Sequence, residues 1–272
     1  MDWIHLWPLA LLLLATGLVA GLIAGLLGVG GGIVLVPVLD IVLRYLGVPP
    51  EGSMHVAVAT SLATIIPTAI ASSRAHHARD GIDWTLVRAW LPGLLLGGLL
   101  GSALAARVTA QILAGVFAIV ALLVALKMVL PLDHWRFRET VPRGLAGNLI
   151  ATVISAVSTM MGIGGGTLSV PVMTLTGSAI HRAVGTAAFF GLALAIPGTI
   201  GYLLAEPPVE LPGATVGLIS LSALLAIVPT STWMAPVGAR LAHRLDRRRL
   251  SQVFGVFLCL VAVRMIFRSL SS

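Results

Sequence analysis

Hydrophobic residues fill the chain in ten long runs, which are separated by short polar or glycine- and proline-rich stretches. The runs cover residues 5–27, 33–46, 54–73, 84–105, 110–130, 144–162, 167–177, 182–204, 213–239 and 250–268. Eight of them approach or exceed the roughly 20 apolar residues that a transmembrane helix needs. The two short runs, 33–46 and 167–177, are either interrupted crossings or re-entrant segments. The pattern predicts an all-α polytopic membrane protein.

The chain consists of two similar halves of five runs each. Three pairs of segments align in the same order: residues 28–38 (GVGGGIVLVPV) with 162–172 (GIGGGTLSVPV), 55–61 (HVAVATS) with 181–187 (HRAVGTA), and 92–128 with 229–265. Conserved order over three blocks indicates an internal duplication. We therefore predict a first transmembrane repeat at 1–130, a cytoplasmic linker at 131–142 and a second repeat at 143–272.

The distribution of basic residues predicts how the halves are oriented, because Lys and Arg accumulate on the cytoplasmic side of a membrane. If the short runs count as crossings, the halves point in opposite directions, and a cytoplasmic linker places thirteen bases inside and four outside. The four outside bases are Arg44, Arg107, Arg264 and Arg268. If the short runs only dip into the membrane, the halves are parallel and the count becomes nine against eight. We therefore predict inverted repeats, each with a short interrupted helix after a glycine-rich break.

Composition agrees with a membrane location. The chain is 58% hydrophobic and only 10% charged, whereas soluble domains carry about 25% charged residues. The net charge of +7 does not indicate nucleic-acid binding, because the basic residues are scattered between apolar runs apart from a cluster at 244–249. The sequence predicts a multi-pass protein of the cytoplasmic membrane. Its expected partner is the lipid bilayer, and binding to nucleic acid is not expected.

The glycine runs are the first candidate binding site. They comprise Gly30, Gly31 and Gly32 in the first half and Gly164, Gly165 and Gly166 in the second. Glycine weakens a helix by about 1 kcal/mol relative to alanine, and such a run survives at membrane depth only inside protein or beside a wet cavity. A new helix follows each run, so inverted repeats would bring two helix N-termini, which favour anions, together near the midplane. The alternative is a close-packed hinge without a ligand.

Hydroxyl side chains are the second candidate. Thr60, Ser61 and Thr186 lie about one and a half helical turns beyond the histidine of their aligned block. They could donate hydrogen bonds to an oxyanion without the cost of a buried charge, or bond back to their own helix carbonyls. Because Ala187 stands where the first half has Ser61, the two halves are not expected to bind alike.

Four charged or titratable residues near these motifs are candidates for ion coupling or anion attraction: Asp40, His55, His181 and Arg182. Acids inside membrane elements are functional candidates by default, although Asp40 could reach the interface at the end of its short helix. The histidines could simply start interfacial helices, and Arg182 could snorkel. We find no nucleotide-binding, metal-binding or catalytic-triad motif, so neither a cofactor nor an enzymatic activity is expected.

The motifs resemble those of the TauE/SafE family, the sulfite-exporter-like permeases. The resemblance rests on the duplicated Gly-x-Gly-Gly-Gly with a following proline, at 28–37 and 162–171, and on the His-x-Ala-Val-x-Thr pair at 55–60 and 181–186. It covers essentially the whole chain. It implies export or uptake of small sulfur-containing anions, such as sulfite or organosulfonates, driven by an ion gradient.

The leading hypothesis is a secondary transporter that moves a small oxyanion by alternating access, with H⁺ or another ion as the coupling ion. Alternatives are a passive anion channel, a membrane-embedded enzyme and an accessory subunit. The sequence alone leaves open the substrate, the direction of transport, the coupling ion and the oligomeric state.

Overall fold

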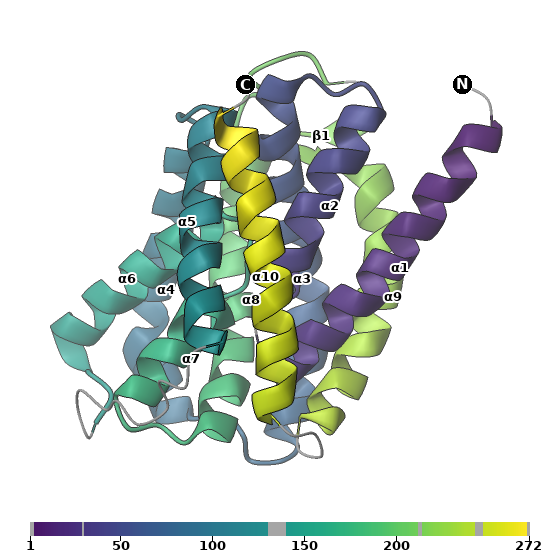
Figure 1. Ribbon diagram of the computed structural model, residues 1–272. Coiled ribbons are helices and arrows are strands. Elements are labelled where there is room, and N and C mark those ends of the chain that lie inside the picture. The colour runs from purple at the N-terminus through teal and green to yellow at the C-terminus, as the bar shows by residue number, and fades with distance from the viewer. Residues whose placement is uncertain (1–2, 29, 130–139, 212–213, 243–246, 271–272) are drawn as a thin grey trace.

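The computed structural model describes residues 3–28, 30–129, 140–211, 214–242 and 247–270. Within these ranges the chain forms ten helices and one two-stranded sheet (Figure 1). The elements are α1 Trp3–Leu27, α2 Gly32–Tyr45, α3 Pro50–His77, α4 Trp84–Ala105, α5 Ala110–Val129, α6 Gly144–Met160, α7 Gly166–Leu175, α8 Ile180–Leu204, β1 Thr215–Val216, β2 Ile219–Ser220, α9 Leu221–Leu241 and α10 Arg247–Leu270. The ten predicted hydrophobic runs correspond to the ten helices in order. The linker predicted at 131–142 lies largely outside the described residues.

Five of the described helices are long and apolar enough to cross a bilayer, namely those at Trp7–Leu27, Pro50–His77, Trp84–Ala105, Ile180–Leu204 and Leu221–Leu241. Shorter apolar helices accompany them, including the 10-residue α7. The prediction of an all-α polytopic membrane protein is confirmed.

One predicted boundary is wrong. The run at 213–239 is not a single helix, because β1 and β2 form a small antiparallel hairpin before α9 begins. Gly217, with φ of +54°, makes the turn between the two strands. Ser220 then caps α9 by accepting a hydrogen bond from the amide of Ala223. Hydrophobicity alone missed this break because the hairpin residues are themselves mostly apolar.

The two halves run in opposite directions (Figure 1). The chain enters α1 at the upper end of the view and leaves α5 at the lower end, whereas it enters α6 at the lower end and leaves α10 at the upper end. The short helices α2 and α7 start in the middle of the molecule and also diverge. Each therefore reverses the chain after the preceding long helix, as the interrupted element of an inverted repeat would.

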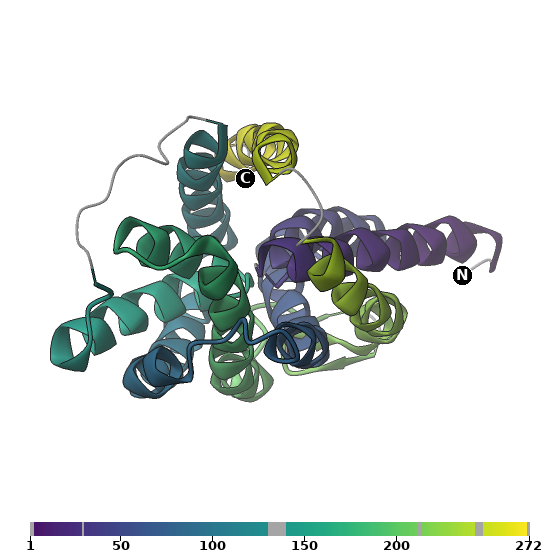
Figure 2. The ribbon, with the colours of Figure 1, turned by 90° about the horizontal axis from the view of Figure 1, so that it is seen from below.

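The repeats are intertwined rather than side by side. The first helix of each half packs along the fourth helix of the other, α1 on α9 and α6 on α4, while α3 and α8 pack together at the centre. Figure 2 shows α5 and α10 as a pair beside this group. Among the described residues, two hydrophobic core clusters form, and each contains residues of both halves.

Small residues make the close helix contacts possible. A side chain added at Gly17, Gly21 or Gly25 of α1 would collide with the backbone or side chains of α9. Glycines of α4, such as Gly93 and Gly97, approach α6 in the same way. The glycine spacing in the first run thus serves helix packing, as small residues commonly do in membranes.

Candidate functional site

The two glycine runs meet at the centre of the molecule. A Cβ added at Gly30 would lie 2.8 Å from the Cα of Gly164, and one added at Gly32 would collide with the carbonyl oxygen of Gly162. Ser61 of α3 joins the same point, donating a 2.7 Å hydrogen bond from its hydroxyl to that oxygen. We call this contact region the glycine crossing. Residues that lie 134 positions apart in the sequence are here in backbone contact.

The short helices begin at the glycine crossing and lead away from it. Gly31, the N-cap residue of α2, has φ of +74°, a left-handed conformation that favours glycine. Its counterpart Gly165, the N-cap residue of α7, has φ of −55°. All of these glycines and Gly166 are buried. Two helix N-termini of opposite direction therefore meet inside the protein, as the inverted repeat predicts, but with different backbone conformations.

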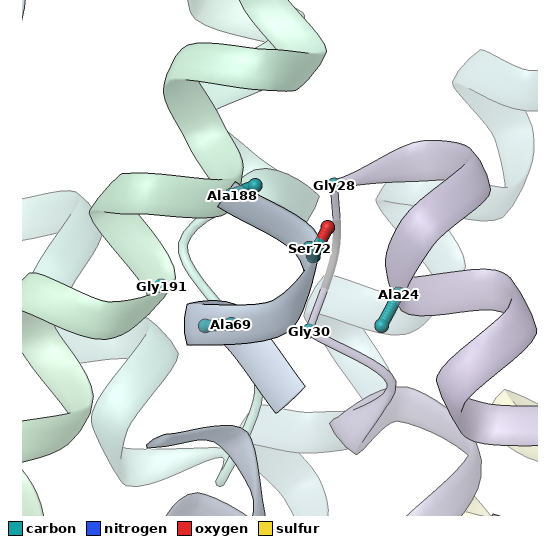
Figure 3. A pocket seen from close by; sticks show the side chains of 7 residues that line it. All are labelled: Ala24, Gly28, Gly30, Ala69, Ser72, Ala188 and Gly191. Atoms are coloured by element: carbon teal, nitrogen blue, oxygen red, sulfur yellow. The ribbon is translucent and has the colours of Figure 1, made fainter. Parts of the chain in front are cut away.

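A small cavity adjoins the glycine crossing. It is lined by Ala24, Gly28, Gly30, Ala69, Ser72, Ala188 and Gly191 and has a volume of about 10 Å³, enough for about one water molecule. Figure 3 shows the hydroxyl of Ser72 directed toward the segment that carries Gly28 and Gly30. This hydroxyl is buried and has no hydrogen-bond partner, so it is available to a solute or water.

The wall of the cavity is built from smaller residues than the equivalent positions of the repeat. In the alignment of the repeats, its wall residues Ala188 and Gly191 correspond to Leu62 and Ile65. Both of these larger side chains are fully buried, and Ile65 lies close to Gly30 and Gly191 of the cavity wall. The cavity lies near the C-terminal end of α3, next to the loop that the charge distribution assigns to the cytoplasm. The two halves thus have side chains of different size at equivalent positions beside the glycine crossing.

The paired threonines have structural partners away from the cavity. The hydroxyl of Thr60 accepts a 2.9 Å hydrogen bond from the amide of Ser220, and that of Thr186 accepts one of the same length from the amide of Asp83. Ser220 and Asp83 are the N-cap residues of α9 and α4. Each threonine thereby anchors the fourth helix of the opposite half. Their expected role in anion binding stays a prediction, as does that of Ser61.

Asp40 lies among arginines and is fully buried. Its carboxylate oxygens lie 3.7 Å from guanidinium nitrogens of Arg44, Arg264 and Arg268. One oxygen also accepts a 2.7 Å hydrogen bond from the hydroxyl of Ser53. Asp40 is thus the shared counter-ion of three arginines, and its expected role in ion coupling stays a prediction.

The remaining titratable candidates lie at helix ends. His55 is buried, and its ring nitrogens face the carbonyl oxygens of Glu51 and Val108 at 3.1 and 3.0 Å. His181 and Arg182 are exposed in the first turn of α8, about nine residues or 13 Å along the helix from the cavity residue Gly191. The structure does not bring these three residues to the glycine crossing.

Sequence reasoning missed two features of this structure. Ser72 was not recognised as a candidate because an isolated serine in an apolar helix usually forms a hydrogen bond to a carbonyl of its own helix. Arg264 and Arg268 were counted only as outside bases, although two arginines four residues apart in an apolar element are an intramembrane signal in their own right.

Comparison with known proteins agrees with this architecture. The family described as Sulfite exporter TauE/SafE matches residues 13–265. A probable membrane transporter protein of Haemophilus influenzae is 34% identical, covering 95% of this chain and 98% of the relative. A probable membrane transporter protein of Bacillus subtilis, YunE, is 24% identical over 96% and 98% of the two chains. No solved structure matches the chain. The helical inverted halves, the glycine crossing and these matches together lead to one conclusion: the chain belongs to the TauE/SafE family and is a membrane transport protein.

Proposed function

We propose that the protein is a secondary transporter that moves a small sulfur-containing oxyanion, such as sulfite or an organosulfonate, across the cytoplasmic membrane by alternating access. The observation that carries the proposal is the glycine crossing, where the N-termini of α2 and α7 meet inside the protein. Helix N-termini offer amide donors and partial positive charge to an anion. The family description, which names sulfite export, supports the choice of a sulfur oxyanion.

The difference between the two halves beside the glycine crossing supports alternating access. The second half has the small Ala188 and Gly191 in the wall of the cavity with the unpartnered Ser72 hydroxyl, whereas the first half has Leu62 and Ile65 at the equivalent positions. In a transporter with inverted repeats, exchange of conformations between the two halves would open the opposite side. The cavity has room for about one water molecule, so binding of an oxyanion requires the side chains around it to move apart.

The test is uptake of ³⁵S-sulfite into proteoliposomes. Gly31→Leu and Gly165→Leu each place a large side chain at a helix N-terminus of the crossing and should abolish uptake. Gly47→Leu is the matched control for the positive φ of Gly31, since Gly47 has φ of +87° and nothing within 4 Å of an added Cβ. It should retain uptake.

Folding of each variant is checked by size-exclusion chromatography, so that loss of transport is not loss of protein. Unchanged uptake in folded Gly31→Leu and Gly165→Leu protein would contradict the site. Counterflow against a sulfite gradient separates the transporter from the channel, because a passive channel cannot concentrate its ion.

A further inference from the structure

A group of charged side chains lies at the end of α2 that is far from the glycine crossing. It consists of Asp40 and the three arginines around it, Arg44, Arg264 and Arg268, and we call it the arginine cluster. Arg44 belongs to the last turn of α2, and the other two belong to the C-terminal half of α10. Two segments that are more than 200 residues apart therefore supply charges to one point.

The cluster carries more positive than negative charge. Asp40 is its only buried acid, and the exposed Glu51 at the rim is a second acid whose charge acts on Arg268. Three arginines thus face two carboxylates. A surplus of positive charge in a partly buried place is stabilised by an anion from outside the chain.

Arg44 and Arg264 also keep hydrogen-bonding capacity. The three contacts to Asp40 measure 3.7 Å, whereas hydrogen-bonded pairs of this kind measure about 2.7–2.9 Å. Arg44 Nε donates to the hydroxyl of Ser53 at 3.3 Å, and Arg264 Nη1 donates to the carbonyl of Pro37 at 3.1 Å. A guanidinium group has five N–H donors, so each of these two arginines keeps donors beyond these bonds. Since the side chains of these two arginines are 34% and 39% exposed, their guanidinium groups can reach a solute.

The position of the cluster is opposite to that of the cavity. Ser53, which bonds to Asp40, and Ser72, which lines the cavity, are 19 residues apart on α3, about 28 Å along the helix. The cluster thus lies on the face that the charge distribution assigns to the outside, where three of its four predicted bases gather.

The duplication does not account for the cluster. In the repeat alignment, Asp40 and Arg44 correspond to Thr174 and Ser178 of the second half. The second half therefore cannot build the same acid–base pair at the other end of the molecule. The cluster therefore occurs at one face only. If its role were to support the architecture common to both halves, an equivalent cluster would be expected at the other face.

We propose that the arginine cluster is an oxyanion-binding site on the non-cytoplasmic face, separate from the glycine crossing. Arg44 and Arg264 hold the anion through charge-assisted hydrogen bonds, and Asp40 keeps the guanidinium groups in position. The chemistry fits a free sulfur oxyanion or the phosphate of a lipid headgroup. The inference rests on the proposed function in one respect: the free solute is taken to be a sulfur oxyanion because that is the proposed substrate.

Binding is measured without transport. The purified protein is placed in nanodiscs of neutral phosphatidylcholine, and its unfolding temperature is followed as sulfate is added, because a ligand of the folded state raises that temperature. A second series contains no sulfate but increasing phosphatidylglycerol. Arg264→Gln and Arg44→Gln are compared with the unchanged protein and with Arg107→Gln, an exposed base assigned to the same face outside the cluster.

Each arginine variant should raise the half-saturating sulfate concentration about ten-fold or more, the worth of one hydrogen bond to a charged group. Arg107→Gln should leave it unchanged. Stabilisation by phosphatidylglycerol alone, lost in the same variants, supports the site and identifies a lipid phosphate as its ligand. No stabilisation in either series, or an equal effect of Arg107→Gln, would overturn the site. The two tests are independent. Sulfite uptake by the unchanged protein would support the proposed function even if the arginine cluster bound no anion, and a lack of uptake would not change the binding result.

Discussion

The close approach of the two glycine runs predicts a specific loss of stability in Gly30→Ala. An alanine at this position costs about 1–2 kcal/mol for its positive φ of +78°. Its Cβ would also lie 2.8 Å from the Cα and 3.1 Å from the nitrogen of Gly164. Backbone atoms cannot rotate away as a flexible side chain can, so overpacking adds about 1–3 kcal/mol. The total is a loss of about 2–5 kcal/mol in the free energy of unfolding.

Gly47→Ala separates the two contributions. Gly47 also has a positive φ, +87°, but nothing lies within 4 Å of an added Cβ. It should lose only the conformational part, about 1–2 kcal/mol. Both variants are measured by reversible unfolding in mixed micelles with increasing sodium dodecyl sulfate. If Gly30→Ala is no less stable than Gly47→Ala, the two glycine runs are not in contact and the central argument about the site fails.

Three further predictions concern the anchors and the topology. Thr60→Val leaves a buried amide at the start of α9 without its acceptor, and Thr186→Val does the same for a part-buried amide at the start of α4. Each should lower the free energy of unfolding by about 1–3 kcal/mol, while Thr→Ser at either position should retain most of the stability. Ser61→Ala, which gives the first half the residue of the second, removes one bond to a carbonyl oxygen; it should cost about 1 kcal/mol in the same unfolding assay, and a loss as large as that of Thr60→Val would contradict this ranking. In a cysteine-free background, a membrane-impermeant maleimide should label Glu206→Cys in intact cells and Arg79→Cys only after permeabilisation, because these exposed residues follow α8 and α3 at opposite ends of the molecule. Labelling of both from one side would refute the inverted arrangement.

Most of the fold could be predicted because a helix that crosses a membrane must be long and apolar, and such segments are visible in the sequence. Apolar runs of sufficient length fix the helices, and the alignment of 28–38 with 162–172 reveals the repeat. The hairpin before α9 was not predicted because it is short and mostly apolar. Its turn at Gly217 therefore did not differ in hydrophobicity from the residues around it.

The candidate site was predictable only in part. The glycine runs were identified from sequence because three successive glycines are costly in a helix. The partners of Thr60 and Thr186 were not, since each accepts a bond from an amide more than 100 residues away. The same holds for the arginine cluster, which α2 and α10 assemble from opposite halves of the chain. Long-range side-chain contacts leave no periodic pattern in a single sequence.

The exchange of helices between the halves has a consequence for how such a chain could arise. Because α1 packs on α9 and α6 on α4, a single half on its own would leave its first and fourth helices without their partners. An ancestral protein of one half could have covered these surfaces only by pairing with a second copy inserted into the membrane upside down. The present chain has the two-fold arrangement that such an antiparallel pair would keep if its two copies were joined in one gene. In a joined chain the two halves need not stay identical, and the arginine cluster, present at one end only, is consistent with this.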